Sequence, residues 1–130
     1  MTLARSSVAA PTRALQLTST LVVLVLAWQF VTAGQMLPRG GPEELHAAGA
    51  IVLHMASGLA VVAAFLLARA TGGPWWPTVL AAVVFVLTFV QAWTGSYAPL
   101  AVHVPGAIVL TVGSVWVAAW AWMVVGRSRA

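Results

Sequence analysis

Four long apolar stretches, separated by short segments rich in proline and glycine, constrain the fold of this chain more than any other feature. They cover about residues 15–36, 43–69, 77–96 and 100–126, and each is long enough to cross a hydrocarbon core, which takes ~20 helical residues. The chain is 62% hydrophobic and only 6% charged, so it lacks the polar side chains that would cover a water-facing surface. The sequence therefore predicts an all-α, integral membrane four-helix bundle that forms a single domain over residues 1–130.

The six arginines predict how the helices are oriented across the membrane. Cytoplasmic flanks carry most of the basic residues of a membrane protein. Arg39 lies alone on the side that also holds both glutamates, and the other five arginines flank the opposite side: Arg5, Arg13, Arg69, Arg127 and Arg129. Both termini are therefore expected in the cytoplasm. The absence of lysine beside six arginines suggests a multi-pass protein of a bacterial cytoplasmic (inner) membrane.

Other classes of protein fit this composition poorly. The isoelectric point of about 11.7 would suggest a nucleic-acid partner in a soluble protein, but here the arginines are scattered at segment ends without a basic stripe, so no nucleic acid is expected. The lack of cysteine excludes disulfides and thiolate metal sites. A cleaved signal peptide is the rival interpretation of the first stretch, because Val31 and Ala33 resemble a cleavage site. The long apolar core favours a retained helix.

Two matching segments indicate an internal repeat. The string HAAGAIVL from His46 and the string HVPGAIVL from His103 are identical at six of eight positions. Further matches occur around these strings: Ser57 with Ser114, Gln29 with Gln91, and Gly34 with Gly95. We interpret the chain as two copies of one helical hairpin, arranged as parallel repeats about an axis near the membrane normal. His46 and His103 are then expected at equal depth, at the outer starts of the second and fourth helices.

This symmetric pair is the candidate site. Imidazoles from facing helices of a bundle can bind a metal, so His46 and His103 are interpreted as axial ligands of a haem iron. Gly49 and Gly106 lie one turn further inward, where a missing side chain leaves room for a flat macrocycle or for close helix contact. The alternative is a pair of interfacial histidines satisfied by water and headgroups. A zinc or copper site would be incomplete, because no carboxylates or thiols converge with these histidines.

Three further residues are candidates for supporting roles. His54 lacks a symmetric partner and is expected ~12 Å deeper than His46, as a ligand of a second haem, as part of a proton or quinone path, or as a packed histidine bonded to a hydroxyl such as that of Ser57. The last is favoured. Glu43 precedes His46 by three positions and either orients the imidazole or simply suits the helix dipole, which is the favoured reading. Arg39 could pair with a haem propionate or with the glutamates.

The pattern Glu43-Glu44-Leu45-His46, followed by an apolar helix, a hairpin and a second helix headed by His103, resembles one four-helix half of the haem A synthase family. It is also similar to small four-helix proteins of high-GC bacteria. The resemblance implies haem held between histidines on the second and fourth helices. It also implies a role for Glu43 in chemistry on a haem side chain. Haem A synthases contain two such units and this chain contains one.

Together these features predict a small b-type cytochrome-like membrane protein that binds one haem b for electron transfer or haem handling. The first alternative is a cofactor-free membrane subunit that packs on a larger respiratory or transport assembly. The second is a haem-modifying enzyme of the haem A synthase type, with Glu43 as its catalytic residue. The expected partners are the lipid bilayer, a quinone or respiratory protein, and a second copy in a homodimer.

Overall fold

The computed structural model describes residues 2–37, 41 and 43–127, with side chains described for residues 8–37, 41 and 43–123. These residues form four helices and no strand: α1 (Thr2–Met36), α2 (Glu43–Thr71), α3 (Trp76–Tyr97) and α4 (Leu100–Arg127). All four are long and apolar enough to cross a membrane. The predicted all-α fold with four candidate membrane-spanning helices is therefore confirmed.

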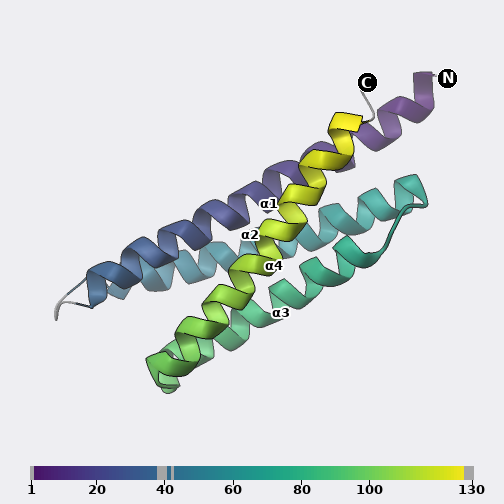
Figure 1. Cartoon of the computed structure of the whole chain (residues 1–130). Helices are drawn as coiled ribbons and strands as arrows, with labels where there is room; N and C mark the ends of the chain where they lie inside the picture. Colours follow the sequence, from purple (N-terminus) through teal and green to yellow (C-terminus); the bar gives the residue numbers. More distant parts are fainter. Residues whose placement is uncertain (1, 38–40, 42, 128–130) are drawn as a thin grey trace.

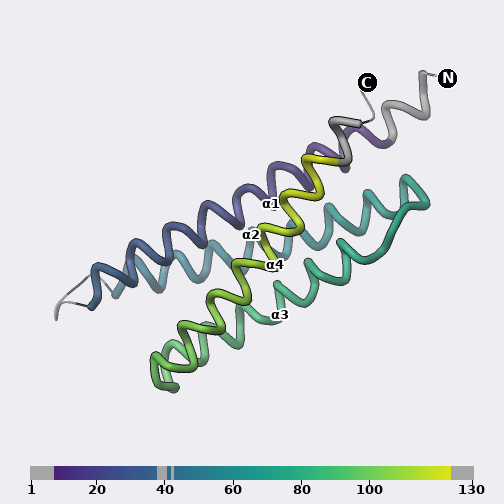
Figure 2. The backbone as a smooth tube through the Cα atoms, viewed as in Figure 1, coloured from purple at the N-terminus to yellow at the C-terminus, as the bar shows by residue number. Residues whose placement is uncertain are grey.

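The chain runs back and forth along one bundle, so successive helices are antiparallel (Figures 1 and 2). Helix α1 packs against α2 and α4, and α3 packs against the same two helices. Helices α2 and α4 therefore lie diagonally across the bundle from each other. The start of α1 and the end of α4 lie at the same end of the bundle (Figure 1). A side chain early in α2 can thus face one early in α4.

Glycine and proline residues lie at the boundaries of the helices. Gly72 follows α2 with a φ of 59°, a left-handed conformation that glycine adopts without steric cost. Pro77 lies in the first turn of α3, where its missing N–H would have no helical partner. Ala98 ends α3 in an extended conformation just before Pro99, and α4 begins at the next residue. The last three helices accordingly agree with the predicted boundaries to within two residues.

Helix α1 departs from the prediction, because it begins at Thr2 rather than near residue 15. It is about 50 Å long and so exceeds the ~30 Å hydrocarbon thickness. Its first part is less apolar and contains Pro11, yet it continues the same helix. Hydropathy marks the part of a helix that fits inside lipid. It does not mark how far that helix extends into the polar interface.

The interior of the bundle is built in layers. One apolar cluster includes Leu53 and Leu110, and a second lies nearer the termini around Leu15. Three buried serines from three helices line a cavity of about 10 Å³ between these clusters: Ser19, Ser57 and Ser114. Each hydroxyl donates to the carbonyl four residues earlier in its own helix, at 2.6–2.8 Å. These small, internally satisfied side chains allow the helices to approach closely.

Polar side chains also join α1 to α4 near the termini. Gln16 is buried, with 1% of its surface exposed, and its Nε2 donates to the backbone oxygen of Ala121 at 3.3 Å. Trp122 donates from Nε1 to the hydroxyl oxygen of Thr20 at 3.1 Å. These two hydrogen bonds connect the first and last helices and so help close the bundle.

Candidate functional site

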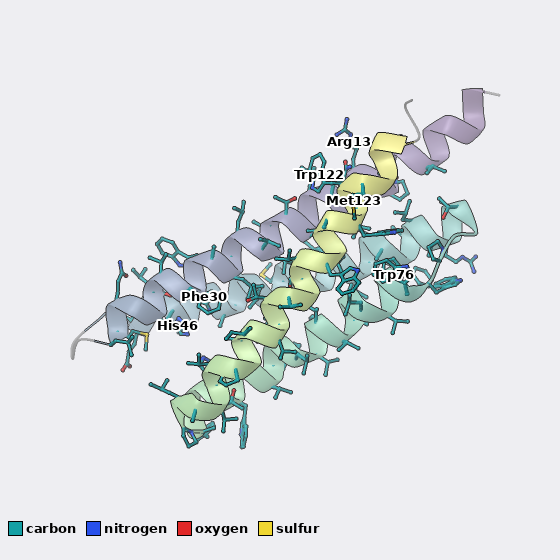
Figure 3. The ribbon with its side chains drawn as sticks, in the orientation of Figure 1. Arg13, Phe30, His46, Trp76, Trp122 and Met123 are labelled. Carbon is teal, nitrogen blue, oxygen red and sulfur yellow. The ribbon has the colours of Figure 1, made fainter. Side chains whose placement is uncertain are left out.

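His46 and His103 face each other between the diagonal helices α2 and α4. Their ring centres are 6.5 Å apart and the ring planes are inclined at 71°. Figure 3 shows His46 near the end of the bundle where α1 ends and α2 begins, far from Arg13 and Trp122 at the opposite end. The structure thus brings together the two histidines that the sequence pattern paired.

Each histidine is held by a threonine on the preceding helix. The hydroxyl oxygen of Thr32, on α1, lies 2.9 Å from Nδ1 of His46. The hydroxyl oxygen of Thr94, on α3, lies 3.2 Å from Nδ1 of His103. Both threonines are buried, at 0% and 6% exposure respectively. The same ring nitrogen is therefore engaged in both histidines, which leaves Nε2 of each ring for another partner.

The hydroxyl of Thr32 lies within hydrogen-bond distance of its own helix as well as of His46. The carbonyl oxygens of Trp28 and Gln29 lie at 3.2 and 3.1 Å from it. When the hydroxyl proton goes to one of these carbonyls, the hydroxyl oxygen accepts from His46 and Nδ1 carries the proton. Nε2 then presents a lone pair, which is the form of imidazole that binds a metal.

His103 is held by two polar groups rather than one. Thr94 donates its hydroxyl proton to the carbonyl of Gln91 at 3.1 Å, so its oxygen can accept from Nδ1 just as Thr32 does. The amide nitrogen of Gln91, in the orientation that satisfies its neighbours, also lies 3.0 Å from this Nδ1. A protonated Nδ1 donates to Thr94, and an unprotonated Nδ1 accepts from Gln91.

The Gln91 amide also bridges the backbone of α4 beneath His103. Its nitrogen donates to the carbonyl of His103 at 3.0 Å, and its oxygen accepts from the N–H of Ala107 at 3.2 Å. These two backbone groups lie four residues apart and would ordinarily bond to each other. Pro105 lies between them and is the proline inside this helix. One side chain of α3 therefore supports the turn of α4 that carries His103.

Gly49 and Gly106 make room for these glutamines. A Cβ atom at Gly49 would lie 2.6 Å from Oε1 of Gln29, and a Cβ atom at Gly106 would overlap the Gln91 amide. Of the two roles expected for these glycines, close contact between neighbouring helices is the one that the structure displays.

Glu43 does not contribute to the described site. Glu43 is exposed at the start of α2, and among the described residues its carboxylate makes no hydrogen bond to His46. Thr32 occupies the orienting position that was considered for this carboxylate. Arg39 lies outside the described residues.

His54 lies apart from the pair, against α3. Its ring centre is 4.2 Å from that of Phe89, and its Nδ1 is buried without a hydrogen-bond partner among the described residues. The hydroxyl of Ser57 donates to the carbonyl oxygens of Leu53 and His54 and not to the imidazole. The expectation that Ser57 satisfies this imidazole is therefore wrong, because a serine inside a helix bonds most readily to its own backbone.

Sequence reasoning missed both threonines, although the sequence carries their signal. Gln29 and Thr32 are separated by three positions, and Gln91 and Thr94 by the same three. This spacing places the amide and the hydroxyl on one face of α1 and of α3. Extending the comparison of the two halves by one helical turn would have found them.

The protein side chains at the histidine pair limit which metal groups could bind there. Among the residues that the structure describes, no group of three or more histidine, cysteine, aspartate or glutamate side chains could hold a metal ion. A pair of imidazoles suits an iron whose other four ligands belong to a macrocycle, as in haem. It does not suit a bare zinc or copper ion, which takes more ligands from the protein.

No protein-family model, curated protein or solved structure matches this chain.

Proposed function

We propose that the protein is a small b-type cytochrome-like membrane protein that holds one haem b between α2 and α4, with His46 and His103 as axial ligands. The observation that carries this proposal is the facing pair of imidazoles, each held at Nδ1 by a buried threonine. A haem bound there would supply a one-electron Fe(III)/Fe(II) couple for electron transfer, or would itself be the cargo in haem handling.

The spacing of the rings supports the proposal. In axial ligation each nitrogen lies about 2 Å from the metal, with the ring centre roughly 1 Å behind it, so the two ring centres are about 6 Å apart. The observed separation of 6.5 Å is close to this value. A ring can rotate about its metal–nitrogen bond, so the inclination of 71° does not conflict with ligation.

The residues of the chain have three tasks in this proposal. His46 and His103 would bind through Nε2, and Thr32 would orient the ring of His46 by accepting its Nδ1 proton. Thr94 would do the same for His103 when Nδ1 of that ring is protonated. The buried leucines Leu53 and Leu110 lie seven residues after the histidines, about 10 Å further into the bundle, and exclude water from that direction. Exchange of electrons or of haem would then occur at the end of the bundle that holds the pair.

The repeat and the orientation belong to the same proposal. We infer that the chain is a duplicated hairpin, because the matched strings place both histidines at the same point of their helices. The arginine distribution favours termini in the cytoplasm of a bacterial cell and a haem near the outer leaflet.

Optical spectroscopy tests the proposal directly. Protein expressed with ample haem and purified in detergent should show a Soret band, and on reduction the sharp, split visible bands of a six-coordinate low-spin haem. A detergent extract of membranes from cells that do not express the protein provides the background spectrum. A colourless, folded protein would contradict the proposal and favour the cofactor-free subunit, in which the glutamines simply fill the space beside Gly49 and Gly106.

Substitution of Thr32 should change the affinity for haem. Thr32→Val removes the acceptor for the Nδ1 proton of His46 and should weaken haem binding by about 10- to 100-fold, as is typical when the hydrogen-bond partner of a metal ligand is lost. Titration of the haem-free protein with haem measures the affinity. Thr32→Ser keeps the hydroxyl and should retain most of it. Equal affinities for the valine and serine variants would show that Thr32 only packs against His46.

A further inference from the structure

His54, the third histidine, lies near the middle of α2, where few groups can form a hydrogen bond with an imidazole. Helix α2 spans Glu43–Thr71, so His54 is three residues from its middle residue, Ser57. The hydrocarbon core takes ~20 helical residues, which places His54 well inside it. Lipid tails offer no hydrogen bond there, and polar groups within a membrane commonly mark function.

The surroundings of His54 leave both ring nitrogens without a partner. Nδ1 is buried and unpartnered, and no hydrogen bond links either nitrogen to another described residue. The side chain is only half-buried, on the flank of the bundle where α2 meets α3. Neighbouring Met55 and Phe89 are exposed, at 65% and 49%. Part of the imidazole is therefore open at a flank that faces lipid if the helices span the membrane, while Nδ1 is covered by protein.

Aromatic rings border this imidazole. The planes of the His54 and Phe89 rings are inclined at 33°, with 4.2 Å between ring centres. Phe85 meets Phe89 edge to face, with 5.1 Å between ring centres. Phe85 also packs against α2 at Gly58, where a Cβ atom would touch its ring at 3.4 Å. Aromatic side chains are favourable neighbours for a flat aromatic ligand.

We propose that His54, Phe85 and Phe89 form a binding site for a membrane-dissolved quinone on the α2–α3 flank. Because Nδ1 is buried, the contact would be made by Nε2. Nε2 would donate to a quinone carbonyl when it carries the proton, and would accept from a quinol hydroxyl when it does not, so either redox form can pair with it. An acyl lipid carries no polar group at this depth and would leave Nε2 unpaired. A quinone combines the ring, the oxygens and the solubility in lipid that the site requires.

This site does not depend on the haem. His54 lies eight residues beyond His46, about 12 Å along α2, and shares no described contact with the histidine pair. Quinone binding and haem binding can therefore succeed or fail separately. If both hold, the protein would bring a lipid-soluble electron carrier close to its haem.

Nuclear magnetic resonance of the imidazoles tests the site. The chain has only three histidines and no cysteine, so labelled histidine gives three ring spin systems and a naphthoquinone finds no thiol to react with. Full-length protein in lipid nanodiscs is titrated with menadione (2-methyl-1,4-naphthoquinone). The His54 nitrogen signals, assigned with His54→Phe, should shift and saturate, and those of His46 and His103 should stay in place.

The control ligand is 2-methylnaphthalene, which has the same rings and methyl group without the carbonyl oxygens. It should leave the nitrogen shifts of His54 almost unchanged. Equal shifts with both ligands, or a menadione response that never saturates, would overturn the proposal. In a second measurement, quenching of tryptophan fluorescence by menadione should lose its saturable part in His54→Phe. Unchanged saturation in that variant would place the quinone elsewhere.

Discussion

Changing His46 or His103 to alanine is expected to abolish the low-spin haem spectrum. Each variant lacks one axial ligand, so haem that remains bound should be five-coordinate and high-spin. The affinity should fall by more than the about 10- to 100-fold that accompanies loss of a ligand's hydrogen-bond partner. Visible absorbance of the reduced protein and electron paramagnetic resonance of the oxidised protein measure both changes.

His54→Ala is the matched control for these variants. It removes an imidazole from the same helix as His46 but from outside the facing pair, so the low-spin spectrum should survive. Loss of that spectrum in His54→Ala with retention in His103→Ala would transfer the ligand role to His54. The two outcomes cannot be confused, because His54 lies deeper than His46 and His103 and has other neighbours.

A rescue experiment distinguishes ligation from general damage to the fold. His46→Gly leaves space beside Thr32, whose hydroxyl can still bond to the N–H of a free imidazole. Imidazole added in solution should therefore restore a six-coordinate spectrum in this variant. A variant that had lost its fold would not respond. Failure of rescue in a folded His46→Gly protein would count against direct ligation by His46.

The fold was predictable because hydropathy and helix-breaking residues act locally. Gly72 and Pro77 mark helix boundaries through their own backbone chemistry, and the structure places boundaries next to both. The early start of α1 was not predictable in this way. Beyond the hydrocarbon a helix is no longer required by lipid, and its extension depends on packing and on propensities that differ little among residues.

The site was only partly predictable, for a different reason. His46 and His103 are rare residues in repeated strings, so the sequence alone could pair them. Thr32 and Thr94 are of a type that is common in membrane helices, and the roles of these threonines depend on which face of α1 or α3 meets the next helix. The rotation of each helix about its own axis decides which face that is. This rotation is set by packing between helices and cannot be read from the sequence of one helix.

The error at His54 has the same origin. A hydroxyl one turn away along a helix looks like a natural partner for an imidazole, but Ser57 directs its proton to its own backbone instead. The ring turns outward to Phe89 on α3. A local pairing rule failed because the backbone competed for the hydroxyl and because a neighbouring helix offered an aromatic surface.

Gly106→Ala is expected to destabilise the protein. The new Cβ atom would overlap the amide of Gln91, and that amide cannot shift without releasing the His103 carbonyl and the Ala107 N–H that it bridges. Overpacking of this kind costs about 1–3 kcal/mol, which should exceed the ~1 kcal/mol that alanine gains over glycine inside a helix. Thermal unfolding in detergent, monitored by circular dichroism, measures the change.

Two further variants isolate the cause. Gly34→Ala places the same methyl group where no atom lies within 4 Å, so it should leave stability unchanged or raise it by up to about 1 kcal/mol. The double variant Gln91→Ala with Gly106→Ala removes the overlapping amide and should recover part of the loss. Equal stability of the Gly106→Ala and Gly34→Ala proteins would show that the Gln91 amide does not fill the space beside Gly106 on α4. The support for the turn that carries His103 would then have to come from Thr94 alone.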